Sequence, residues 1–280
     1  MTKCCKKLIH ITITLCLLTS AGIASSEDFR KRLHHQANEV VTEDDVMTEI
    51  NFGRDIGARI LGRYPLLQNE EIQKYVRLVG KSLALYSSRP ELSFHFAVLD
   101  ADHANAYSTP GGYVFITKGA IDLMRDESEL AAVLGHEIGH ITRKHIVREF
   151  NIKGSDNSGI SGISRMIGGS QDTARVAFSQ AVDRAVKILF ETGFKQQDEY
   201  DADQEAIMLL AATEYDPVSL ERYLKRINSK GNKDTQEKMT HPPSSERLGA
   251  LNQFVRDEGL NNVDYKQARK RFRKYVKRNS

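Results

Sequence analysis

The stretch ELAAVLGHEIGHITRKH (residues 129–145) constrains this chain more than any other. It holds two histidines, His136 and His140, four positions apart, with Glu137 between them. On a helix, positions i and i+4 lie on one face, so the two imidazoles present their nitrogens to a single point. Neutral imidazole nitrogen suits zinc, and a glutamate one residue around the helix reaches a water molecule at that point. The stretch therefore predicts a metal-bearing helix with Glu137 as general base.

Two histidines leave such a site incomplete, because a catalytic zinc site uses three protein ligands and one open position. His145 is an unsuitable third ligand, since on a continuous helix it lies about half a turn from the ligand face. The segment EYDAD offers carboxylates instead, with Glu199 and Asp203 four positions apart on the face of Ala202 and Ala206. Small alanines allow two helices to approach closely. We expect Glu199 to reach the metal and Asp203 to orient a ligating imidazole by a hydrogen bond.

Both segments also have plainer interpretations. The histidines are compatible with a helix that faces solvent or caps core contacts, and the acidic residues with a solvated helix surface. Asp201 and Glu205 are lesser candidates for the third ligand. A domain without any metal is therefore an alternative that the sequence leaves open.

Charge and cysteine content narrow the class of protein. The chain has 280 residues with a net charge of +3, and Lys3, Lys6 and Lys7 account for the whole excess. Without that first segment the charges balance, so we expect no nucleic-acid partner. All three cysteines also lie within residues 1–24. A chain that lacks this segment has no cysteine nucleophile and no Cys-ligated zinc.

Residues 1–24 resemble an export signal, with a basic start, an apolar run and small residues before Ala24. Cleavage is the favoured interpretation and an uncleaved membrane anchor the alternative. We therefore expect an exported protein in the periplasm of a Gram-negative-type bacterium. The expected divisions are a signal peptide (1–24), a loose lead-in (25–43), a catalytic domain (44–251) and a basic tail (252–280).

Hydrophobic periodicity predicts an α+β domain that is mainly helical, with a small β-sheet. Helices are expected from near Thr42, from Glu70 with an apolar stripe reaching Leu85, from Asp126 with a capping box to Glu129, and over residues 196–213. The helix from Asp126 should bury one stripe, made by Leu130, Val133, Leu134, Ile138 and Ile141. Strands are expected from Leu92 and over 113–117, with a type II turn at STPGG before the second strand. The Gly- and Ser-rich stretch 151–171 predicts a mobile loop.

The basic end, YKQARKRFRKYVKR, carries eight Lys and Arg residues. Ala268, Phe272, Tyr275 and Val276 share one helical face. A solvated helix that packs this thin apolar edge on the domain is the favoured interpretation. Weak contact with anionic lipid at a membrane surface is the alternative.

HEIGH followed by EYDAD resembles the gluzincin metallopeptidases of the HtpX, CAAX prenyl protease and BepA group (peptidase family M48). Their hallmark is HExxH with a downstream ExxAD, which Glu199, Ala202 and Asp203 match. NAYSTPGGYVFITKGAI from Asn105 and HPPSSER from His241 resemble two further elements of the family. The likeness covers residues 44–251. The chain departs from the family in having no membrane spans beyond the first segment and no helical repeats, so stand-alone exported catalytic domains are the best match.

This resemblance implies a zincin-like fold with one zinc ion per chain, held by His136, His140 and Glu199. It also brings His241 and Arg247 near the metal, where both would support the developing oxyanion. For His241 two alternatives stay open: it occupies the open coordination position in a resting form, or it merely precedes a helix.

The expected function is that of a zinc endopeptidase for unfolded or misfolded cell-envelope proteins, with Glu137 activating water. Substrate would add as an extra strand along Asn105, Ala106 and Tyr107. The alternative is a zinc-bearing, chaperone-like module that binds unfolded envelope proteins with little or latent proteolysis.

Overall fold

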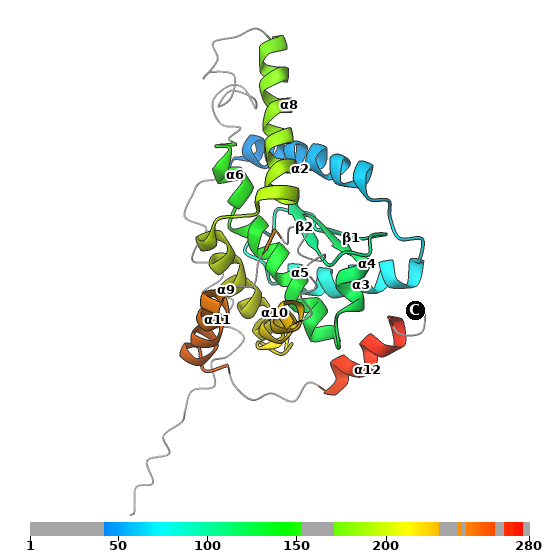
Figure 1. The fold of residues 1–280 in the computed structure, drawn as a ribbon. Coiled ribbons are helices and arrows are strands. Elements are labelled where there is room, and N and C mark those ends of the chain that lie inside the picture. Colours follow the sequence, from blue (N-terminus) through cyan, green and yellow to red (C-terminus); the bar gives the residue numbers. More distant parts are fainter. Residues whose placement is uncertain (1–41, 153–170, 230–239, 242–244, 261–265, 277–280) are drawn as a thin grey trace, which may run out of the picture.

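The computed structural model describes residues 42–152, 171–229, 240–241, 245–260 and 266–276, and in this part helices surround a three-stranded sheet (Figure 1). The first elements are α2 (Glu43–Arg63), α3 (Glu70–Ala84), β1 (His95–Leu99), β2 (Ala106–Thr109), β3 (Tyr113–Thr117), α4 (Lys118–Asp122), α5 (Glu127–Thr142) and α6 (His145–Glu149). They are followed by α8 (Gln171–Lys187), the π-helical turn η1 (Ile188–Thr192), α9 (Gln196–Ala212), α10 (Ser219–Ser229), α11 (Ser245–Asp257) and α12 (Lys266–Tyr275). The predicted α+β, mainly helical fold is confirmed. The signal segment and most of the predicted loop at 151–171 lie outside the described residues.

The sheet has the strand order β1-β3-β2, so β2 is an edge strand. β1 pairs with β3 in parallel and β2 pairs with β3 antiparallel. Successive side chains of a strand point to opposite faces. Val114 and Ile116 accordingly pack in a core with α3, α5 and α9, whereas Phe115 packs in a second core with α2 and α8. At the predicted turn before β3, Gly111 has φ 77°, the left-handed value that a type II turn requires after proline.

The helix starts follow from local capping, whereas one helix end differs from the prediction. Thr42 caps α2 in a complete capping box with Asp45, and Asp126 caps α5 by accepting a hydrogen bond from the Glu129 backbone. The predicted stripe of α3 was wrong at Leu85, which is 84% exposed. Leu85 keeps the right-handed helical conformation as the C-cap, but two residues beyond Leu83 it lies about 200° around the helix from the buried stripe.

Helix α5 lies at the centre of the molecule and packs against α9, α3, α10 and α12 (Figure 1). The five residues of the predicted buried stripe are buried, and so is every other residue from Glu127 to Thr142. A helix that is covered on all sides has no solvated face. Its polar side chains therefore have to find partners within the protein.

The basic helix α12 packs on the domain as the favoured interpretation predicted. Phe272 is fully buried and Val276 is 6% exposed. Tyr275 stacks on Tyr75 of α3 with ring centroids 4.7 Å apart. None of the described helices is long and apolar enough to cross a membrane.

Candidate metal centre

Helices α5 and α9 approach each other closely because small residues line both sides of their contact. A Cβ atom added to Gly139 would lie 2.8 Å from the carbonyl oxygen of Ala202. One added to Gly135 would lie 3.4 Å from the Cα of Ala206. The close approach of the two helices therefore depends on Ala202 and Ala206 of α9 and on Gly135 and Gly139 of α5.

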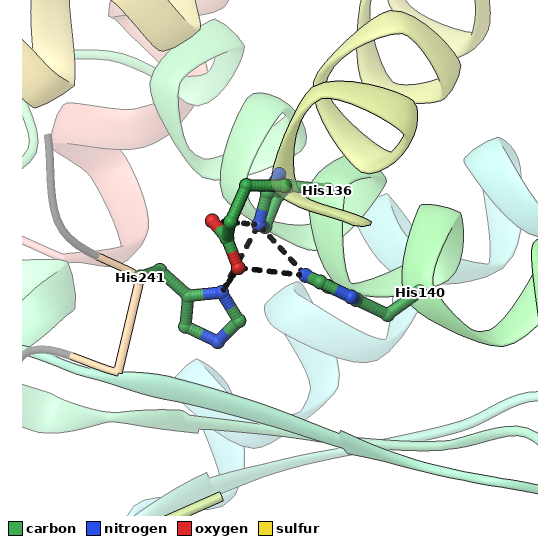
Figure 2. A group of neighbouring side chains, drawn as sticks. His136, His140 and His241 are labelled. Atoms are coloured by element: carbon green, nitrogen blue, oxygen red, sulfur yellow. Dashed lines mark hydrogen bonds and ion pairs between the residues drawn. The ribbon is translucent and has the colours of Figure 1, made fainter. Parts of the chain in front are cut away.

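Across this contact, four side chains converge: His136 and His140 from α5, Glu199 from α9, and His241, which precedes α11 (Figure 2). One donor atom from each lies within 4.8 Å of all the others. The Nε2 atoms of His136 and His140 are 3.0 Å apart. Nδ1 of His241 is 3.2 Å from His136 Nε2 and 2.7 Å from Oε1 of Glu199. All four side chains are buried.

The chemistry of this group fits a zinc ion. Two ring nitrogens only 3.0 Å apart both need a partner, and each imidazole uses its other nitrogen elsewhere. With those second nitrogens protonated, both Nε2 atoms present lone pairs to the same point. Two or three imidazoles with one carboxylate form the nitrogen–oxygen set that zinc binds tetrahedrally. The described residues hold no other such group of histidine, cysteine and carboxylate side chains.

His136 faces the carboxylate of Asp203. Its Nδ1 lies 2.9 Å from Oδ1 of Asp203, and Arg247 in turn donates to both oxygens of Asp203 at 2.6 and 2.7 Å. Burial disfavours the imidazolium, but the hydrogen bonds to Asp203 and Glu199 outweigh it and raise the pKa of His136 to about 9. Burial also opposes ionisation of both carboxylates. Nevertheless, the charge of Arg247 lowers the pKa of Asp203, and that of His241 lowers the pKa of Glu199.

The ring of His140 contacts a second histidine. Its Nδ1 lies 2.7 Å from Nδ1 of His145, which is 3% exposed. Phe194 stacks on the other side of His140, with ring centroids 4.0 Å apart. Burial lowers the pKa of His140 and lowers that of His145 to about 3, so both rings favour the neutral form.

Glu137 lies beside the donor group without being part of it. It is 1% exposed, its Oε1 is 3.7 Å from His241 Nε2, and its Oε2 has no hydrogen-bond partner among the described residues. A buried carboxylate oxygen without a partner is costly, and such atoms are a mark of functional sites.

A hollow that is partly open to solvent lies next to the donor group. Its lining includes His136, Glu137, His241 and Arg247 from the centre, and the predicted substrate residues Asn105 and Ala106. The remaining wall is mostly apolar and is formed by Ala104, Val133, Leu220, Tyr223, Leu224 and Ile227. Tyr107 is not brought to the hollow: its side chain is 1% exposed and packs on Phe190, because it points to the opposite face of β2.

Two features of the site were missed from sequence. The contact between His145 and His140 depends on how the chain turns after α5, which the motif does not encode. The paired hydrogen bonds from Arg247 to Asp203 join residues 44 positions apart, and no local sequence pattern links the two residues. Of the lesser ligand candidates, Glu205 pairs instead with Arg143 at 3.2 Å.

Two imidazoles from an HExxH helix that meet a glutamate from a second helix define the class of gluzincin-type zinc metallopeptidases. The comparison with known families agrees with this assignment: the chain belongs to peptidase family M48, whose model matches residues 69–255. It is therefore a metallopeptidase of a zinc-dependent family.

Several curated proteins are similar to the chain. The beta-barrel assembly-enhancing protease of Escherichia coli O157:H7 is 24% identical over 208 residues, covering 71% of this chain and 42% of that protein. The mitochondrial metalloendopeptidase OMA1 of Schizosaccharomyces pombe is 25% identical over 82% of this chain and 62% of its own length. The metalloprotease LoiP of Escherichia coli K12 is 27% identical over 59% of this chain and 64% of its own. The chain thus spans less than half the length of the first of these relatives.

Proposed function

We propose that the chain is a zinc-dependent endopeptidase that cleaves unfolded or misfolded proteins of the cell envelope. The observation that carries the proposal is the meeting of His136, His140 and Glu199 beside Oε2 of Glu137, to which no described residue forms a hydrogen bond. When bound there, zinc would polarise the scissile carbonyl and make water a stronger acid.

The chain's own residues account for the rest of the reaction. Glu137 takes the proton of the attacking water on the free Oε2 and later passes it to the leaving amine. Its burial keeps this carboxylate away from bulk solvent, so the proton stays within the site. Arg247 lines the same hollow. Its role beyond holding Asp203 is to place positive charge near the developing oxyanion.

Substrate would add to the outer edge of β2, where Asn105 and Ala106 line the hollow. Strand addition uses backbone hydrogen bonds and therefore selects extended, unfolded chains. The apolar wall from α10, with Leu220, Leu224 and Ile227, fits one apolar side chain of the substrate next to the scissile bond. An unfolded protein exposes such side chains, whereas a folded one buries them.

His241 supplies a second, latent state of the same enzyme. Its Nδ1 stands within the donor group, 2.7 Å from Glu199. With His241 in this place, the four side chains would supply a complete tetrahedral set, and a bound zinc would have no open position for water or a substrate carbonyl. We propose that His241 withdraws before cleavage. Replacing His241 with Ala should then raise the rate of cleavage, whereas a lower rate would assign it the oxyanion role.

The export signal predicted at residues 1–24 and the similarity to a beta-barrel assembly-enhancing protease support an envelope location. Digestion of casein and of a reduced, unfolded envelope protein by the purified chain tests the function directly. We expect cleavage that stops with a chelator and returns with zinc. Binding of the unfolded protein without any cleavage, even by His241→Ala, would favour the chaperone-like module instead.

A further inference from the structure

His145 is a buried histidine for which the proposed reaction has no direct use. It lies half a turn from the ligand face on a continuous helix, yet its ring contacts His140. The reason is a break in the helix: α5 ends at Thr142, and Lys144 adopts the left-handed conformation with φ 55°. The strained turn redirects the chain so that the first residue of α6 returns to the metal helix.

The contact between the two rings fixes where their protons lie. Nε2 of His140 faces the donor group, where a ligand nitrogen must carry a lone pair. The proton of His140 is therefore on Nδ1, and Nδ1 of His145 must accept it across the 2.7 Å contact. The proton of His145 is then on Nε2, which faces Oδ1 of Asp198 at 3.7 Å.

We propose that His145 is a positioning residue for the metal ligand His140: it accepts the Nδ1 proton and so fixes the tautomer and angle of the ligating ring. This inference rests on the proposed zinc centre. A ligating histidine ordinarily donates its second nitrogen to a carboxylate, a backbone carbonyl or water. His136 follows that rule through Asp203, whereas His140 has a neutral imidazole in this place, with Asp198 behind it.

Two substitutions of His145 separate this role from simple packing. Asn places an amide oxygen about where Nδ1 of histidine lies and still accepts a hydrogen bond, whereas Leu fills the space without an acceptor. We expect His145→Leu to weaken zinc binding by about 10–100-fold, the usual effect of losing such a partner. His145→Asn should retain most of the affinity of the unaltered chain.

The zinc dissociation constants are measured for the full chain by competition with a chromophoric chelator. Thermal unfolding of the zinc-free proteins accompanies them and reports any general loss of fold. Equal affinity of the unaltered chain and His145→Leu, or equal weakening in Leu and Asn, would overturn the proposal. Absence of zinc binding by the unaltered chain would instead overturn the proposed function.

Nitrogen-15 NMR of the zinc-loaded, histidine-labelled chain gives a test that needs no Leu variant. The spectrum should show His145 protonated on Nε2 and His140 protonated on Nδ1. A proton on Nδ1 of His145 would contradict the inference, because His145 would then donate to His140.

Discussion

Both ends of α5 bury charged residues, but the two ends differ in whether these residues have hydrogen-bond partners. At the N-terminal end, Glu127 accepts hydrogen bonds from Tyr75 and Tyr215 at 2.7 and 2.8 Å and from Arg271 of α12 at 2.7 Å. Glu129, fully buried, accepts two from Arg226 at 2.6 and 2.7 Å. Every oxygen there has a partner, and the ion pairs tie α10 and α12 to the central helix.

At the C-terminal end of α5 the polar groups are only partly satisfied. Within the part of the chain that the structure describes, Glu137 has an oxygen without a partner, and the Nε2 atoms of His136 and His140 face each other at 3.0 Å. Burial alone therefore does not distinguish structural from functional charge on this helix. The distinction lies in whether the protein itself completes the hydrogen bonding, since a site must leave room for metal, water and substrate.

The strongest test of this contrast is Glu137→Gln. The amide cannot take up a proton, so cleavage should fall by about 10²–10⁴-fold, the usual contribution of a general base. Zinc content and the unfolding temperature should stay close to those of the unaltered chain, because Glu137 is not a proposed ligand and pairs with no arginine of the described residues. Digestion of casein with matched zinc analysis measures both, and undiminished cleavage would refute the mechanism.

Glu129→Gln tests the opposite end. Removing one partner of a buried ion pair costs about 3–5 kcal/mol, so the free energy of unfolding should fall by that order. Urea unfolding measures the loss. Zinc affinity of the folded fraction should not change, since Glu129 lies two turns from His136. A variant with full stability but lost zinc would reverse the assignment of the two ends.

The pKa of His136 makes zinc binding depend on pH. This pKa is raised from 6.5 to about 9, so protonation of His136 stabilises the zinc-free folded state. The stabilisation is complete below pH 6.5 and is lost as the pH rises through 9. Zinc must displace that proton. The affinity should therefore rise about tenfold per pH unit between 7 and 8 and level off above 9. Calorimetry in buffers of different ionisation heat should show about one proton released per zinc at pH 7; an affinity independent of pH would contradict the expectation.

The smallest expected effect concerns the apolar wall of the hollow. Ile227→Ala removes apolar surface that would contact a substrate side chain, so the preference for large apolar residues over alanine should fall by about tenfold in kcat/KM. Peptides that differ at one position flanking the scissile bond measure this preference. Val218→Ala is the matched control, because Val218 packs on the same core but does not line the hollow. Equal changes in both variants would remove the wall from substrate selection.

The sequence predicted the parts of the site that depend on helical periodicity. The spacing of His136, Glu137 and His140 and that of Glu199 and Asp203 each place side chains on one helix face. The glycine after Pro110 likewise specified the turn before β3. These features are local, and the structure brings His136, His140 and Glu199 close together, whereas their roles in the reaction stay predictions.

Features that depend on tertiary packing were beyond such reasoning. Every side of α5 is buried because α3, α9, α10 and α12 pack around it. The hydrophobic periodicity of the helix itself does not predict how many neighbours it has. α8 and the π-helical turn after it were not predicted at all. His145 was excluded as a ligand by assuming an unbroken helix, and only the left-handed Lys144 shows why it nevertheless contacts His140.

The contact between Gly139 and Ala202 has a consequence for how this enzyme can change. A single methyl group on Gly139 would clash with the backbone of Ala202 and push α5 and α9 apart. The spacing of the two helices that carry the proposed ligands therefore depends on backbone contacts between Gly139 and Ala202, which do not line the hollow. Selection for new substrates can therefore remodel the walls of the hollow while the metal's surroundings are inherited intact.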